Sequence, residues 1–304
     1  MKNMPIENTA HSEKTSKIPA HTTKRSASER SKSSALTLRR MTLALFLVTA
    51  LAAASSYAET KTQDVRIAFL GEKGGDAWAG AEQGIAEANA QGKFLGLRYV
   101  LLQAEDADSV RGLSPSAVIA ATSALRMSRL ATDVAPIPVL NTTAEDDELR
   151  QACEANAFHV IPSFAMREDA LFQWRRKSPD AGVRALAWHP LFKKYAAAQL
   201  NKRYTETTGR QMNDVSWAGW AAVRIVAESI ARGGTSLPEA VGEHMRTELA
   251  FDGQKGTDMS FRETGQLRQP LLLVKDTEIV GEAPVRGVVD PSNLDSLGLP
   301  GCLK

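Results

Sequence analysis

The sequence lacks the short motifs that mark the common catalytic sites. It contains no G-x-S-x-G nucleophile elbow, no histidine pair at zinc-ligand spacing and no phosphate-binding loop with its lysine. The glycine-rich stretch 71–75 also departs from the G-x-G-x-x-G order of dinucleotide-binding folds. We therefore expect no enzymatic activity and no bound cofactor.

Long hydrophobic runs are scarce as well, and the apolar run at residues 41–54 is too short to cross a bilayer. It has fourteen residues, whereas a membrane-spanning helix needs ~20. Arg39 and Arg40 precede it and small residues follow at 55–58, which is the layout of a secretory signal. We expect cleavage after Ala58 and release into the periplasm, because no adjacent cysteine could carry a lipid. An uncleaved N-terminal anchor is the alternative.

The chain has no excess of basic charge once residues 1–58, which end with this signal at 39–58, are left out of the count. Residues 1–38 are rich in Ser, Thr, Lys and Arg and are expected to be a disordered extension. The remaining 246 residues carry 28 Lys and Arg against 32 Asp and Glu, a net charge of −4. The sequence pI of 8.5 therefore belongs to the N-terminal segment, and we expect no nucleic-acid partner.

Cysteine is rare, with only two residues in the chain, Cys153 and Cys302. Disulfides persist in exported proteins, so the two could pair and staple the C-terminal residues to the first half of the fold. In the chain-entropy model a loop of about 150 residues would be stabilised by roughly 3 to 5 kcal/mol. Two buried free thiols are the alternative, and the sequence leaves both open.

Alternating strand and helix patterns dominate residues 59–165. Short runs rich in β-forming residues occur at 65–70, 97–102, 117–121, 138–140 and 158–161. Helical periodicity follows at 76–90, at 122–130 and again after residue 140, with Asp76 as a helix cap. This alternation predicts an α/β lobe with a doubly wound parallel sheet covered by helices on both faces.

Helices dominate the next segment, residues 166–283. Amphipathic patterns predict helices at 166–177, 190–207, 214–232 and 237–247. A β pattern returns at 259–262, and the runs 270–274 and 278–280 around a turn at 275–277 predict a hairpin. Residues 284–304 are expected to form a C-terminal tail.

Candidate ligand contacts come from the strand ends, because ligands in open parallel sheets bind beyond the carboxyl ends of the strands. The hydroxyl groups there suit the carboxylate of a small solute, together with backbone N–H groups at helix starts. Plain helix capping is the competing interpretation, and Thr143 followed by Asp146 fits a capping box. The expected contacts are Glu72, Asp76, Trp78, Ser123, Asn141, Thr142 and Thr143.

Two further groups of polar residues favour structural roles. Four acids in a row, residues 145–148, invite a hard cation such as calcium or a lanthanide, but adjacent helical positions point in different directions. We therefore expect no metal site. His159 lies in a β run and is expected to be a packed, hydrogen-bonded histidine rather than a catalytic base.

Several longer strings carry a resemblance to a known family, among them Gly265-Gln-Leu-Arg-Gln-Pro270. The others lie at 146–153, 159–163, 197–204, 217–224, 251–256, 260–262 and 294–298. On these residues the chain resembles the type I periplasmic solute-binding proteins of ABC importers, in the branched-chain amino-acid class. It is similar in particular to a subgroup found with PQQ-dependent alcohol dehydrogenase systems.

This resemblance implies a periplasmic-binding-protein-like lobe, a small amino-acid-like solute and an ABC permease as partner. Family members hold solute in a cleft between two lobes and close about a hinge. Here the segment 173–179 runs almost directly into residue 188, so most of the second lobe is expected to be missing, with the later helices completing the first. The alternative function is a periplasmic accessory or docking protein that has lost solute binding.

Overall fold

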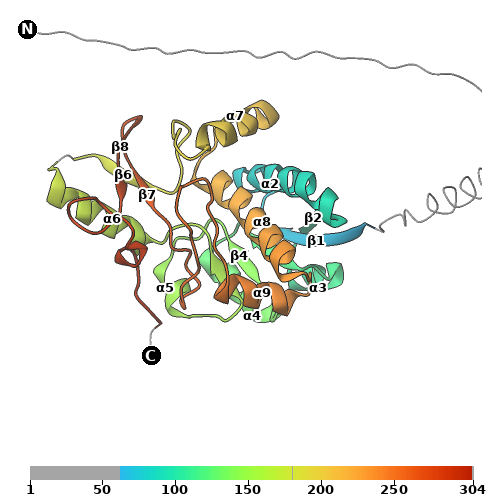
Figure 1. The fold of residues 1–304 in the computed structure, drawn as a ribbon. Helices are drawn as coiled ribbons and strands as arrows, with labels where there is room; N and C mark the ends of the chain where they lie inside the picture. Colours follow the sequence, from blue (N-terminus) through green and yellow to red (C-terminus); the bar gives the residue numbers. More distant parts are fainter. Residues whose placement is uncertain (1–61, 180, 303–304) are drawn as a thin grey trace, which may run out of the picture. The chain divides into compact units, whose positions relative to one another are not determined.

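The computed structural model of the protein describes residues 62–179 and 181–302 (Figure 1). The expected extension at 1–38 and the signal at 39–58, with its cleavage after Ala58, lie outside the described residues. Within the described part, none of the helices combines the length and the apolar character needed to cross a membrane.

A five-stranded parallel sheet forms the centre of the fold, which confirms the predicted fold class. Its strand order is β2-β1-β3-β4-β5, and every neighbouring pair is parallel. The strands are β1 (Gln63–Leu70), β2 (Leu97–Ala104), β3 (Ala117–Ala120), β4 (Val139–Asn141) and β5 (Ala157–His159). Each predicted strand is thus present, with bounds shifted by one to two residues.

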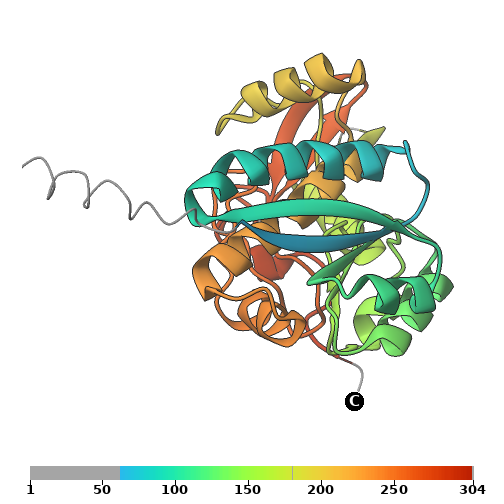
Figure 2. The same ribbon diagram turned by 90° about the vertical axis from the view of Figure 1, so that its right-hand side faces the viewer.

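Helices cover both faces of this sheet, as alternation along β1 shows. Ile67 and Phe69 pack in one core with α2 (Asp76–Gly92) and α8 (Asp214–Gly233). Ala68 and Leu70 point to a second core, on the opposite face. That face is covered by α3 (Ala107–Leu113), α4 (Ala124–Val134) and the short α5 (Asp147–Gln151). Turned by 90°, the view shows α2 running along the neighbouring strands β1 and β2 (Figure 2).

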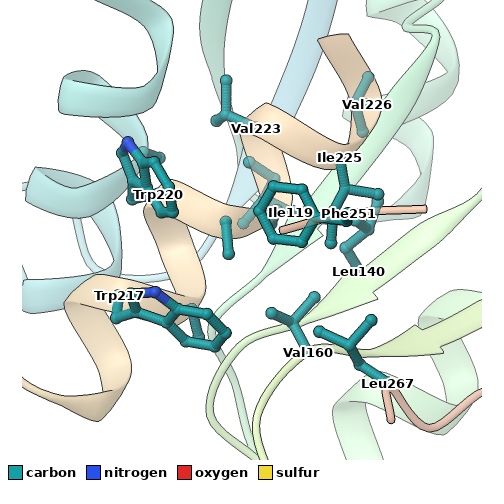
Figure 3. Close-up of a cluster of buried hydrophobic side chains, with 14 of the residues drawn as sticks. Ile119, Leu140, Val160, Trp217, Trp220, Val223, Ile225, Val226, Phe251 and Leu267 are labelled. Carbon is teal, nitrogen blue, oxygen red and sulfur yellow. The ribbon is translucent and has the colours of Figure 1, made fainter. Parts of the chain in front are cut away.

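The later helices join the first core instead of forming one of their own. Trp217, Trp220 and Val223 of α8 lie in one cluster with Ile119 of β3 and Leu140 of β4 (Figure 3). The helix α9 (Pro238–Thr247) adds Val241 and Met245, and α7 (Ala197–Thr208) adds Leu200 and Tyr204. The apolar faces predicted from the helical patterns therefore complete the sandwich around the parallel sheet.

A smaller unit lies beyond the main sheet, with a core of its own. It combines α6 (Phe164–Lys177) with an antiparallel sheet of order β6-β7-β8. Its strands are β6 (Val183–Leu186), β7 (Leu271–Lys275) and β8 (Glu278–Ala283). The predicted hairpin is present, and Asp276 in its turn has a φ of 52°. The pairing of β6 with β7 joins segments about 90 residues apart, which local sequence patterns do not indicate.

Two predicted elements differ from the structure. The helix expected at 190–207 begins only at Ala197, because Tyr195 and Ala196 adopt left-handed conformations and interrupt it. The Asn201 amide donates to the carbonyls of Pro190 and Phe192, so this loop satisfies its backbone groups without a helix. The β pattern at 259–262 forms only isolated bridges. Asp76 occupies the first helical position, and Gly75 is the cap.

The C-terminal residues pack against the rest of the fold. Cys302 forms a disulfide with Cys153, so of the two states that the sequence left open, the structure has the bridged one. Leu297 is buried in the core beneath α6, and the backbone N–H of Gly298 donates to Asp169 at 2.7 Å. Residues 284–302, expected to belong to a C-terminal tail, therefore pack against the small unit.

Candidate functional site at the carboxyl edge of the parallel sheet

Three loops meet where β1, β3 and β4 end. A Cβ atom on Gly71 would lie 2.7 Å from the carbonyl oxygen of Ala121, so glycine is required for this close approach. The hydroxyl of Thr143 donates to the carbonyl of Thr122 at 3.0 Å. The structure therefore brings the loops that carry the predicted contacts side by side.

Asp76 is the best-anchored acid at this edge. Its carboxylate accepts a hydrogen bond from the Asn213 amide at 2.7 Å and lies 3.6 Å from the guanidinium of Arg210. Arg210 also donates to the carbonyl of Gly74, which ties the β1–α2 loop to the segment before α8. The Asp76 side chain remains partly exposed, at 42%.

Trp78 is the third residue of α2 and lies beside a surface hollow. Its ring packs edge-to-face on Phe69 at a centroid distance of 5.0 Å, and the hollow of about 360 Å³ lies between α2 and the end of α7. Gly74 and Arg210 line the same hollow. Glu72 is exposed in the loop that leads to it.

Asn141 and Thr142 have structural roles at the end of β4. Both are fully buried. The Asn141 side chain accepts from the backbone N–H groups of Thr143 and Ala144, which closes the turn after the strand. The Thr142 hydroxyl donates to the carbonyl of Ala120. These two side chains hold the edge together and do not reach its surface.

Ser123 is exposed and precedes α4, but its side chain makes no capping bond. The start of α2 is likewise without a side-chain cap, because its N-cap is Gly75. Uncapped backbone N–H groups at helix starts favour anions. Of the predicted contacts, Glu72 and Ser123 are therefore exposed at this edge, and Asp76 and Thr143 are partly exposed. The exposed amine of Lys73 lies in the same loop, 5.6 Å from the Trp78 ring centroid.

Sequence reasoning missed the ion pairs behind this edge. The guanidinium of Arg167 on α6 lies 2.7 Å from Glu145 and 2.9 Å from Asp214. Burial lowers the pKa of Arg167, but the two carboxylates outweigh burial and raise it overall. Asp214 also accepts from the backbone N–H of Trp188. No local signal connects these residues, since they lie 22 and 47 positions apart in the sequence.

The run of acids at 145–148 does not converge. Glu145 pairs with Arg167, whereas the carboxylate of Asp147 accepts from the backbone N–H of Ala165. Among residues 62–179 and 181–302, no three His, Cys, Asp or Glu side chains are grouped to hold a metal ion. Glu145 lies before α5 and Asp147 is its first residue, and the two carboxylates contact different partners.

A buried network of Arg150, Gln266 and His159 supports the edge from below. The Arg150 guanidinium donates to Gln266 and to the carbonyls of Ala144 and Ile161. Burial lowers the pKa of Arg150 to about 9, although the nearby carboxylates act to raise it. Gln266 donates to the His159 carbonyl at 3.0 Å. Residues from the strings at 146–153 and 265–270, which the sequence analysis singled out, thus meet in a structural role.

His159 is buried and hydrogen-bonded, as the sequence predicted. Its Nδ1 lies 3.1 Å from the amide nitrogen of Asn141 and accepts a hydrogen bond from it. Burial, reinforced by the charge of Arg150, lowers the pKa of His159 well below the ordinary 6.5. The folded protein therefore keeps this ring neutral at pH values where the unfolded chain binds a proton.

Acid should consequently destabilise the fold through His159. Below pH 6.5 the unfolded state binds one more proton, so the free energy of unfolding falls by about 1.4 kcal/mol per pH unit from this group. The free energy of unfolding, measured with urea at pH values between 7 and 5, should depend less steeply on pH in the variant His159→Gln. The control is His189→Gln, because the ring of His189 is partly exposed. This variant should reduce the pH dependence of the unfolding free energy less than His159→Gln does. An unchanged slope in His159→Gln would contradict the assignment.

Comparisons with known proteins identify the fold. No protein-family model matches the chain, and no curated protein matches it. An ABC transporter substrate-binding protein from Desulfitobacterium hafniense matches with a TM-score of 0.58 at 13% identity, over 71% of this chain and 99% of that chain. A second match is LivJ from Streptococcus pneumoniae, a branched-chain amino acid transporter substrate binding protein in complex with isoleucine. Its TM-score is 0.58 at 8% identity, over 72% of this chain and 99% of that chain.

A third structure belongs to the same class. The leucine-, isoleucine-, valine-, threonine- and alanine-binding protein from Brucella ovis, in a closed conformation, matches with a TM-score of 0.62 at 12% identity, over 74% of this chain and 93% of that chain. At such identities the likeness shows the fold alone. The chain therefore has the periplasmic-binding-protein-like I fold. Besides the parallel sheet it contains the smaller unit of α6 and the antiparallel sheet.

Proposed function

We propose that the protein is an extracytoplasmic solute-binding component of an ABC importer, taking a small amino-acid-like solute at the carboxyl edge of the parallel sheet. The observation that carries this proposal is the cluster at that edge. It combines the partly exposed carboxylate of Asp76 with the uncapped starts of α2 and α4. A zwitterionic solute offers the matching charges, with its ammonium group toward Asp76 and its carboxylate toward the helix starts.

Three further points support the proposal. The likeness in fold is to substrate-binding proteins of ABC transporters, and one of them was solved with isoleucine. The expected signal at 39–58 supports export to the periplasm, where such a component would meet its ABC permease. The sequence resemblance to the PQQ-associated subgroup supports a link with alcohol oxidation, so PQQ belongs among the ligands to be tested.

Binding can be tested through thermal stability and calorimetry. A panel of amino acids and PQQ should contain a ligand that raises Tm, because a ligand at 100 times its Kd adds about 2.7 kcal/mol of stability. In Asp76→Asn, which keeps the shape but removes the charge, affinity for an amino acid should fall at least tenfold, because a hydrogen bond between charged groups is worth about 1.5 to 3 kcal/mol.

The matched control is Asp64→Asn. Asp64 lies near the opposite end of β1, paired with Arg98, and loses the same charge without touching the carboxyl edge. Its affinity for the ligand should equal that of the parent. A full panel without any shift in Tm, or equal losses in both variants, would contradict the proposed site.

A further inference from the structure

A second hollow lies on the outer side of α2 and α8, away from the carboxyl edge. Its volume is about 570 Å³, within the range of small-molecule sites. The segment 250–258 closes one side, and Arg203 of α7 lies at another. Gln91, which lines it, is fifteen residues along α2 from Asp76, or about 22 Å at the helical rise. The two regions are therefore spatially distinct.

Arg224 is the cation in this hollow without a carboxylate partner. One of its nitrogens donates to Gln91 at 2.9 Å, whereas Nη1 is buried and, among the described residues, has no hydrogen-bond partner. The other two arginines that line the hollow are paired, Arg203 with Glu87 and Arg232 with Glu228. A buried guanidinium N–H without a partner is costly, so it favours a ligand that brings an acceptor.

Gln254 lines the same hollow and carries an acceptor without a hydrogen-bond partner among the described residues. Its side-chain oxygen is buried and has no hydrogen-bond partner within residues 62–179 and 181–302. The backbone of Gln254 is left-handed, with a φ of 57°, an unfavourable conformation for a residue with a side chain. Strained residues of this kind cluster at ligand-binding positions.

The segment that carries Gln254 is held rigidly from both sides. The carboxylate of Asp252 accepts from the backbone N–H groups of Gln254 and Gly256. The buried amine of Lys255 donates to Gln269 and to the carbonyl of Pro270, and it lies 4.0 Å from the Trp217 ring centroid. The backbone that carries Gln254 is therefore held in place before a ligand binds, which reduces the ordering cost of binding.

The charges around the hollow select the type of ligand. Three arginines face four carboxylates, Glu87, Glu228, Asp252 and Asp258, so a multiply charged anion would be repelled. The Arg224 guanidinium favours a carboxylate, whereas the Gln254 side-chain oxygen favours a hydrogen-bond donor. Asp258, which also lines the hollow, is exposed and adds negative charge there. A carboxylate next to an ammonium group satisfies both demands in one small molecule.

We propose that this hollow is a binding site for a small zwitterion of the α-amino-acid type, separate from the carboxyl edge. Arg224 binds the carboxylate of the ligand, and Gln254 accepts from its ammonium group. Trp220 and Phe251, with ring centroids 6.1 Å apart, form the apolar floor that joins the site to the core (Figure 3). The site does not depend on the proposed transport function.

The charge requirement can be measured with three probes in calorimetric titrations. L-alanine carries both charges, acetate only the carboxylate and methylammonium only the cation. L-alanine should bind at least tenfold more tightly than either fragment. In Arg224→Gln its affinity for the outer hollow should fall at least tenfold, and in Gln254→Asn, which keeps a residue that tolerates the left-handed backbone, at least threefold.

Arg232→Gln is the matched control, because it removes one positive charge from the same helix but only a paired one, and its affinity should change less than twofold. Titrating Asp76→Asn separates the two proposals. Binding that survives Asp76→Asn and disappears in the double variant with Arg224→Gln supports the outer site. Loss of all L-alanine binding in Asp76→Asn alone, or unchanged binding in Arg224→Gln, overturns it while leaving the carboxyl-edge site standing.

Discussion

Replacing Gly80 with alanine is expected to unfold or severely destabilise the protein. A Cβ atom at this position would lie 1.8 Å from the carbonyl oxygen of Ser216, where α2 crosses α8. The contact is with backbone, so no side chain can rotate away and the two helices must separate. Gly219 makes the reciprocal approach, with its Cβ 2.2 Å from the Ala77 carbonyl oxygen. We expect a loss of at least about 3 kcal/mol, measured by urea unfolding.

Gly112→Ala is the control for this prediction. Gly112 lies in α3, and a Cβ there meets no atom within 4 Å. Alanine should therefore leave stability unchanged or raise it by about 0.4 to 1 kcal/mol, because it restricts the unfolded chain. A Gly80→Ala protein as stable as Gly112→Ala would show that α2 and α8 do not pack as closely as the structure indicates.

Removing the disulfide between Cys153 and Cys302 should have the second large effect. The bridge closes a loop with a sequence separation of 149 residues, and such a constraint is worth roughly 3 to 5 kcal/mol in the chain-entropy model. It also secures the C-terminal segment, whose carbonyls at Leu294 and Leu299 accept hydrogen bonds from the buried Arg262. The double variant Cys153→Ser/Cys302→Ser should unfold at correspondingly lower urea concentration.

The single variants supply the internal control. Each already breaks the bridge, so Cys153→Ser, Cys302→Ser and the double variant should lose nearly the same free energy of unfolding. A reducing agent should bring the parent protein to the same stability and leave the variants unchanged. Losses that add up across the two positions would mean that each cysteine acts alone and that the bridge contributes little.

The candidate site shows where sequence reasoning succeeds and where it stops. Strand ends can be located from local patterns, so the sequence predicts the loops at residues 71–76, 122–123 and 141–143, and they do lie together. Whether a side chain there faces solvent depends on neighbours distant in sequence. Asn141 and Thr142 are buried by the turn that they close, whereas Asp76 is held by Asn213, 137 residues away.

The outer hollow was beyond sequence reasoning for the same reason. The string at 251–256 stood out in the sequence, but nothing local indicates that Asp252 and Lys255 fix the position of Gln254. Nor does the helical pattern of α8 distinguish Arg224, which has no carboxylate partner in the described part of the chain, from Arg232, which has one. Both properties arise when α2, α7 and the segment 250–258 come together around α8.

By itself, the sequence determined the parallel α/β sandwich and its chain order. Period-two and period-3.6 hydrophobic patterns are local, and right-handed crossovers leave few ways to arrange the elements they specify. Only the tertiary structure decided that β6 pairs with β7, that Cys153 meets Cys302 and that Arg224 remains without a carboxylate. These outcomes depend on contacts between residues 86 to 149 positions apart, and such contacts form only when the chain packs as a whole.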